Sequence, residues 1–187
     1  MARRLKSKRV LILGAETEIG RAVAIAVAQA GASVAAVAAT GEAEAAFAVQ
    51  RLARRLSAER KVIAQAIDAT NEAAVRVMVR QVSKELGGLD AAIFCADVNG
   101  PMFDAMRLFT TAANRELIRA GGGCVVLAPL GFRGGHFELV SGAVTGSGEV
   151  TEAVPIPRLV NVNVLGRPPD DVIAEVLSAI AGEADSG

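Results

Sequence analysis

The stretch from Arg9 to Ala39 constrains the fold more than any other part of the chain. It contains an unbroken apolar run at Val10–Leu13, a glycine turn, a run with helical spacing, and a second apolar run at Ser33–Val37. Apolar runs without alternation are typical of parallel strands that are covered on both faces. Gly14 is expected to close the first strand and Gly20 to open the helix. The N-terminus of such a helix offers unpaired N–H groups to a pyrophosphate, and glycine lets the backbone approach that group closely.

The rest of the chain continues to alternate between helical and strand patterns. Helices are expected at 41–60, 71–86, 104–121 and from 167 onward, and strands at 61–67, 89–95, 124–127 and 159–166. Such alternation predicts an α/β fold with a doubly wound, Rossmann-like parallel sheet and right-handed crossovers. At 187 residues the chain fits a single domain, 1–187, with a basic leader at 1–8 that is expected to be solvated and a short tail at 182–187.

The glycine turn resembles a motif of a known family. The segment LGAETEIG at 13–20 resembles the TGxxxGIG turn of the short-chain dehydrogenase/reductase family. Gly14, Gly20 and the isoleucine before Gly20 match, whereas the leading Thr of the motif is a leucine here and its middle Gly is Glu18. A carboxylate close to a pyrophosphate is repulsive, and its Cβ takes space from the backbone.

Further segments resemble the same family in the same order. The segment Asp68–Thr70 is similar to the D-x-T/S segment whose Asp contacts adenine in that family, and 159–166 is similar to its last strand. Asp68 has a second interpretation, as a residue that shapes a turn or a helix N-terminus. The resemblance covers nearly the whole chain and identifies it as a diverged, shortened member. The cofactor-binding positions that it implies are Gly14, Thr17, Ile19, Gly20, Asp68, Ala69 and Ala96.

The positions that carry the family's chemistry are filled by other residues. In the family a Tyr and a Lys act on the substrate and cofactor together with a Ser and an Asn. Here the Asn-Asn-Ala-Gly segment is replaced by 94–97, Phe-Cys-Ala-Asp, and the Ser region 128–131 is Ala-Pro-Leu-Gly. The segment between the fourth strand and Phe109, which would hold the catalytic Asn, is shortened relative to the family. Alignment puts Glu138 at the Tyr position and Gly142 at the Lys position, and the chain contains no tyrosine at all. The resemblance therefore predicts a member that lacks the catalytic Asn, Ser, Tyr and Lys.

Other residues offer only weak candidates for chemistry. His136 and Glu138 lie in a glycine loop and could form an acid/base pair, or His136 could be an ordinary surface histidine. Cys95 and Cys124 lie in apolar runs on strands expected to be neighbours, as core thiols do. With one histidine and no CxxC spacing, no metal site is expected.

The segment 141–148 is rich in Gly, Ser and Thr and predicts a loop or hairpin where the family has a helix of its oligomer interface. A homo-oligomer or another protein partner is therefore expected through a different surface.

No apolar run reaches the roughly 20 residues of a membrane helix. The chain begins without a signal-peptide pattern, its net charge is zero, and no aromatic residues interleave the leader, so neither a membrane nor a nucleic-acid partner is expected. The sparse cysteines favour the cytoplasm.

The choice of cofactor stays open at this stage. An acidic residue after the second strand favours NAD and an arginine favours NADP, but 38–40 is Ala-Ala-Thr. Three functions remain. The first is a short-chain dehydrogenase/reductase-like protein that binds NAD or NADP and has a regulatory or structural role. The second is an NAD(P)H-dependent oxidoreductase with a non-standard acid/base, and the third is an assembly subunit that binds no nucleotide.

Overall fold

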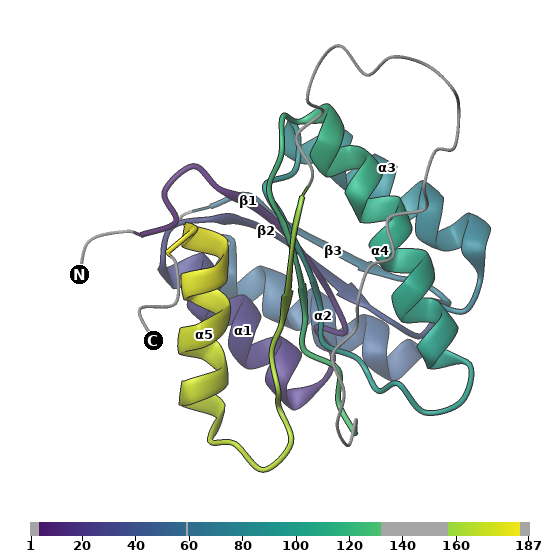
Figure 1. Ribbon diagram of the computed structural model, residues 1–187. Helices are drawn as coiled ribbons and strands as arrows, with labels where there is room; N and C mark the ends of the chain where they lie inside the picture. Colours follow the sequence, from purple (N-terminus) through teal and green to yellow (C-terminus); the bar gives the residue numbers. More distant parts are fainter. Residues whose placement is uncertain (1–3, 59, 132–156, 184–187) are drawn as a thin grey trace, which may run out of the picture.

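The protein is built around one parallel sheet flanked by helices on both faces (Figure 1). The structure, a computed structural model, describes residues 4–58, 60–131 and 157–183. In these residues six strands are ordered β3-β2-β1-β4-β5-β6, and every neighbouring pair is parallel. The elements in chain order are β1 (Arg9–Leu13), α1 (Glu18–Gln29), β2 (Ser33–Ala38), α2 (Ala43–Leu56), β3 (Val62–Ala66), α3 (Glu72–Leu86), β4 (Ala91–Phe94), α4 (Met102–Arg119), β5 (Cys124–Leu127), β6 (Arg158–Asn161) and α5 (Pro169–Ala181).

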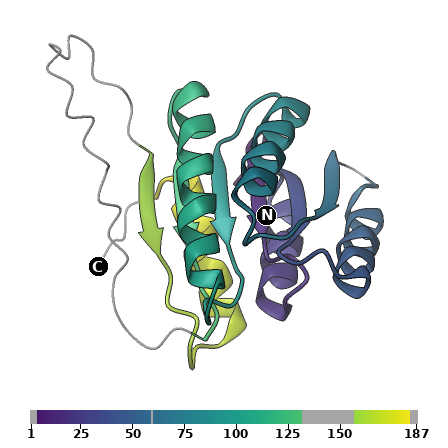
Figure 2. The ribbon, with the colours of Figure 1, turned by 90° about the vertical axis from the view of Figure 1, so that its right-hand side faces the viewer.

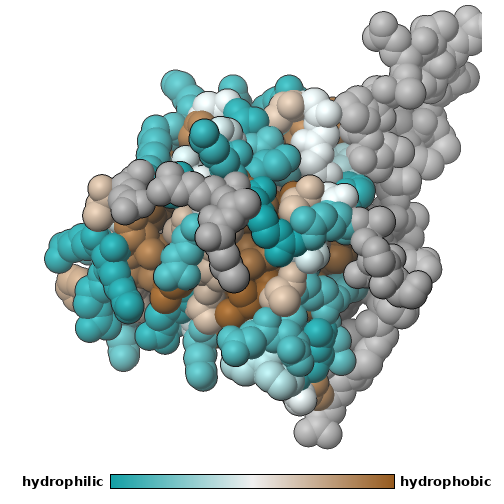
Figure 3. Space-filling view, turned by 90° about the vertical axis from the view of Figure 1, so that its left-hand side faces the viewer, coloured by the Kyte–Doolittle hydropathy of each residue, from teal (hydrophilic) through white to brown (hydrophobic). Residues whose placement is uncertain are grey.

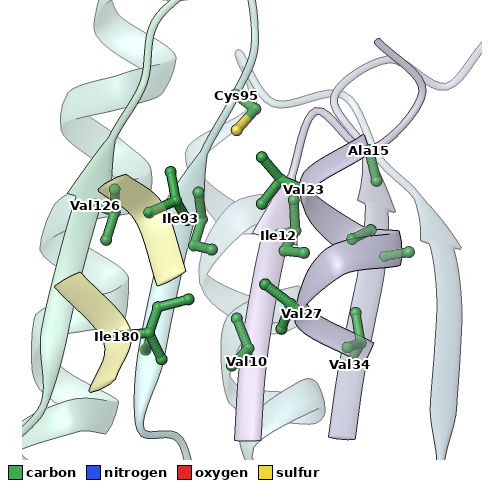
Figure 4. Close-up of a cluster of buried hydrophobic side chains, with 14 of the residues drawn as sticks. Val10, Ile12, Ala15, Val23, Val27, Val34, Ile93, Cys95, Val126 and Ile180 are labelled. Carbon is green, nitrogen blue, oxygen red and sulfur yellow. The ribbon is translucent and has the colours of Figure 1, made fainter. Parts of the chain in front are cut away.

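Two hydrophobic cores lie on opposite faces of the sheet. Successive residues of a strand point to opposite faces, so Val10 and Ile12 of β1 join a core with α1, α2 and α5, shown in Figure 4. Leu11 and Leu13 join the other core, with α3 and α4, the two helices in front of the sheet in Figure 2. All four side chains are fully buried. The predicted doubly wound α/β fold is confirmed. Its strands are apolar without interruption because both of their faces are buried.

Several elements begin or end at other residues than the sequence pattern predicts. Helix α1 begins at Glu18, two residues before Gly20, because the side chain of Thr17 caps it. Helix α2 is shorter than the predicted 41–60 at both ends. Strand β6 stops at Asn161 instead of 166, since it pairs with the four residues of β5.

Part of the basic leader is packed and not solvated. Leu5 is fully buried, and its N–H donates to the carbonyl of Ala30 at 2.9 Å. Arg4 forms an ion pair with Glu183, just beyond α5. A single leucine within the basic run therefore anchors residues 4–8 to the core. Figure 3 shows the face with α1 and α5, where apolar side chains lie between hydrophilic ones. Within the described residues, no helix has the length and apolar character to cross a membrane.

Candidate functional site

The glycine turn between β1 and α1 lies at the carboxyl edge of the sheet and is closely packed. The N–H groups of Gly14 and Ala15 both donate to the carbonyl of Val37 in β2, at 2.9 and 3.1 Å. Gly14 has φ +93°, and a Cβ there would lie 2.6 Å from the carbonyl of Cys95. A Cβ on Gly20 would lie 2.0 Å from the carbonyl oxygen of Gly14. Only glycine fits these two positions, and the structure brings both predicted residues together in the turn.

Thr17 and Ile19 lie at the start of α1, with different roles. The Thr17 hydroxyl accepts a hydrogen bond from the Gly20 N–H at 3.0 Å, and it lies 2.7 Å from the Gly14 carbonyl oxygen, to which it donates. This side chain therefore holds the turn together. The N–H groups of Glu18 and Ile19 have no partner in the described part of the chain. They are the free donors of a helix N-terminus, where a phosphate is favoured.

Glu16 reaches from the turn to the end of β2. Its Oε1 accepts a hydrogen bond from the N–H of Ala39 at 3.1 Å, while Oε2 is buried without a hydrogen-bond partner among the described residues. Burial raises the pKa of Glu16, against the opposing effect of its hydrogen bonds with its own N–H and that of Ala39. The sequence pattern points to Glu18 instead, but Glu18 is exposed at the first position of α1. The partner of Glu16 is a backbone group, so no residue pattern pointed to it.

Asp68 and Ala69 follow β3 on the same edge of the sheet. Asp68 is exposed, and its Oδ1 accepts hydrogen bonds from the hydroxyl and the N–H of Thr70, at 2.6 and 3.0 Å. These two bonds hold the pKa of Asp68 below its usual value. Ala69 is fully buried, and its N–H donates to the carbonyl of Ala39 at 3.1 Å. Asp68 thus shapes a turn, and its contact with adenine stays a prediction.

Ala96 follows β4, and the chain there stays hydrogen-bonded to the chain that follows β5. The N–H of Leu130 donates to the carbonyl of Ala96 at 3.0 Å, and the N–H of Val98 returns to the carbonyl of Leu130 at 3.3 Å. Ala96 is almost fully buried, and its N–H would be 2.8 Å from a Cβ on Gly14. Of the segment that replaces Asn-Asn-Ala-Gly, both Ala96 and Cys95 therefore pack directly against the turn.

The two cysteines are buried, as expected of core thiols. Burial raises the pKa of Cys95 to about 12, with a further rise from the charge of Glu16. Burial also raises the pKa of Cys124, on the neighbouring strand β5. Both thiols are free and stay protonated at neutral pH. In the described ranges no three His, Cys, Asp or Glu residues are grouped so that they could hold a metal ion. His136 and Glu138 lie outside the described residues.

Comparisons with known proteins place this architecture in a family. The family model described as short chain dehydrogenase matches residues 8–125, which span the sheet from β1 into β5 and include the glycine turn. The chain belongs to the short-chain dehydrogenase family.

Only part of each relative matches this chain. An uncharacterized oxidoreductase of Escherichia coli K12, YghA, is 38% identical over 87 residues, which cover 46% of this chain and 29% of YghA. A short-chain type dehydrogenase/reductase of Mycobacterium marinum is 31% identical, with TM-score 0.57, over 66% of this chain and 56% of that one. A short chain dehydrogenase of Burkholderia cenocepacia J2315, solved in complex with NADP, is 29% identical, with TM-score 0.59, over 67% and 56%. The chain thus spans less than a third of the curated relative and about half of these solved structures.

The residues of the turn fit the pyrophosphate of a nicotinamide dinucleotide. Gly14 and Gly20 add no side chain of their own at the two ends of the turn, and the free N–H groups of Glu18 and Ile19 lie at the positive end of α1. The carboxylates of Glu16 and Glu18 are the opposing feature, since each adds negative charge to the same turn. A bound dinucleotide would supply hydride chemistry, and the residues of the turn could contribute by binding and orienting it.

Proposed function

We propose that this member of the short-chain dehydrogenase family binds NAD or NADP at the glycine turn and has a regulatory or structural role without the family's standard catalysis. The observation that supports binding is the turn itself, with Gly14 and Gly20 packed against backbone and two free N–H groups at the start of α1. The observation that supports the non-catalytic part is the lack of any tyrosine in the sequence.

Loss of the tyrosine removes the group that would exchange a proton with the substrate oxygen. Of the other catalytic roles, the Ser region contains Ala128 and Pro129, which have no hydroxyl or ionisable group. The first two positions of the Asn-Asn-Ala-Gly segment at the end of β4 are occupied by Phe94 and Cys95, both fully buried. A neutral, buried thiol with a pKa near 12 is a poor substitute for an acid or base at pH 7.

The second function is an NAD(P)H-dependent oxidoreductase that uses His136 or Glu138 as its acid/base. A turnover screen with NADH and NADPH against carbonyls and quinones separates the two functions, with His136→Ala and Glu138→Gln as matched variants. The proposal predicts no turnover above the rate without protein. Turnover that falls in either variant would establish the enzyme and refute the non-catalytic role.

The third function is an assembly subunit, which gains support from the outer surface of α4. Phe103 is 48% exposed and Ile118 is 39% exposed, at opposite ends of this helix. Contiguous apolar patches mark contacts between proteins. We propose that these two side chains belong to such a contact, with a second copy of the chain or another protein on α4. Light scattering after size exclusion tests it: an oligomer that Ile118→Glu dissociates supports the surface, and a monomer at micromolar concentration counts against a homo-oligomer.

We propose the cytoplasm as the compartment, since Cys95, directly after β4, and Cys124 in β5 are both free, buried thiols.

A further inference from the structure

Among the described residues, a buried carboxylate oxygen at the corner between the glycine turn and the end of β2 lacks a hydrogen-bond partner. Ala39, the first residue after β2, has both backbone groups bonded: its N–H to Glu16 Oε1, and its carbonyl to the N–H of Ala69, each at 3.1 Å. The other carboxylate oxygen, Glu16 Oε2, is buried and has no partner among the described residues.

The chemistry of this atom decides what it can bind. An ionised carboxylate oxygen only accepts hydrogen bonds, and an unpaired buried acceptor is costly. A hydroxyl group, which donates, would satisfy it. A phosphate, which is anionic and accepts hydrogen bonds, would be repelled. The last torsion of a glutamate has a broad energy minimum, so the carboxylate can turn to present either oxygen while Ala39 keeps a partner.

Glu16 lies where the adenosine ribose of a dinucleotide is expected. In a βαβ nucleotide site the pyrophosphate lies on the first helix N-terminus, and the adenosine ribose lies toward the end of the second strand. An acidic group is expected there on β2, but Ala38, Ala39 and Thr40 provide none. Glu16 brings a carboxylate to that place from the preceding turn, through its bond to Ala39.

Resting on the proposed nucleotide binding, we propose that Glu16 selects NAD(H) over NADP(H) by accepting a hydrogen bond from the adenosine ribose and repelling a 2′-phosphate. The chain next to Ala39 reinforces this selection. The residues between β2 and α2, 39–42, include no Lys or Arg that would pair with a 2′-phosphate, and Glu42 adds a second carboxylate.

Isothermal titration of the full chain with NAD and with NADP tests this selection, since it measures binding without turnover. We expect the wild type to bind NAD at least about tenfold more tightly than NADP, because like charges a few ångström apart oppose binding by this order. Glu16→Gln keeps the shape of the side chain and an oxygen that can accept from Ala39. It should bring the two dissociation constants to within about a factor of two or three of each other, since the repelled charge is gone.

Glu18→Gln is the matched control, because it removes the same charge from the same turn at an exposed position. It should change the affinities for NAD and NADP by the same factor and keep their ratio. A ratio that Glu16→Gln leaves unchanged, or that Glu18→Gln lowers equally, overturns the role of Glu16. NADP bound as tightly as NAD by the wild type also overturns it, while nucleotide binding itself stands. Binding of neither nucleotide overturns both the proposed function and this inference.

Discussion

Gly20→Ala tests whether the turn is packed as tightly as the structure indicates. The added Cβ would lie 2.0 Å from the carbonyl oxygen of Gly14, 2.8 Å from its carbonyl carbon, and 2.9 Å from the hydroxyl of Thr17. The backbone must therefore move by more than about 1 Å to restore an ordinary van der Waals contact. That carbonyl accepts hydrogen bonds from the hydroxyl and the N–H of Thr17, at 2.7 and 3.1 Å, so the movement also disturbs the cap of α1.

The expected cost follows from these two effects. Overpacking of a tight site costs about 1–3 kcal/mol, and loss of a helix cap about 1 kcal/mol more, so Gly20→Ala should lower the free energy of unfolding by about 3 kcal/mol. For a chain of this length that corresponds to a Tm lower by roughly 6–12 °C, which urea unfolding and calorimetry both measure.

Gly41→Ala provides the control for this prediction. No atom lies within 4 Å of a Cβ at Gly41, and its φ lies outside the left-handed region. The substitution should stabilise the protein by about 0.5 kcal/mol, because it restricts the unfolded chain. If Gly20→Ala were as stable as Gly41→Ala, the close approach of α1 to Gly14 would be refuted.

Three further substitutions test the charges and the cap. Asp90→Asn removes a carboxylate that accepts from Nε and from the backbone N–H of Arg9, both at 2.8 Å, and should cost about 1–3 kcal/mol at pH 7 in urea unfolding. Burial acts to raise the pKa of Asp90, but the hydrogen bonds from Arg9 outweigh it and lower the pKa below 3.8. The stability that the ionised Asp90 contributes is therefore fully present above pH 3.8 and is lost as the pH falls through the lowered pKa. Glu16→Gln should raise the Tm at pH 7. Burial raises the pKa of Glu16 in the folded protein, so the stability that its neutral carboxyl contributes is fully present below pH 4.5 and is lost as the pH rises through the raised pKa. At pH 7 the buried carboxylate is charged, and glutamine removes that charge. Thr17→Val should cost about 1 kcal/mol through loss of the cap, whereas Thr17→Ser, measured beside it, should cost much less.

Each of these substitutions has an outcome that contradicts its reasoning. An Asp90→Asn variant as stable as the wild type would show that the pair with Arg9 contributes nothing at pH 7. A lower Tm for Glu16→Gln at pH 7 would show that the second carboxylate oxygen is satisfied. A larger loss for Thr17→Ser than for Thr17→Val would assign the role of this residue to its methyl group instead of its hydroxyl.

The architecture of the sheet could be predicted because its strands are buried on both faces. The runs at Val10–Leu13 and Cys124–Val126 have no polar interruption, and the glycines after the helices mark the turns. The ends of the elements were less predictable, since they depend on partners. The hydroxyl of Thr17 moves the start of α1 forward to Glu18, and the length of β5 limits that of β6.

The candidate site was predictable only where it depends on the backbone of the turn. Gly14 and Gly20 have a recognisable spacing because any side chain there would collide with backbone. Glu16 has no such signal, since it bonds to the N–H of Ala39, a group that nearly every residue type provides. The same holds for Leu5, whose burial depends on a contact with the carbonyl of Ala30 across the fold.

The central claim, that the glycine turn binds a dinucleotide, is tested most directly by the thermal unfolding of the full chain with NAD, NADH, NADP and NADPH, each at millimolar concentration. A ligand present at 100 times its dissociation constant adds about 2.7 kcal/mol to the free energy of unfolding, which is several degrees for a chain of this size. Such a rise is expected with NAD or NADH, and a smaller one with NADP or NADPH. An unchanged Tm with all four would contradict the central claim and leave the turn around Gly14 as a structural feature alone.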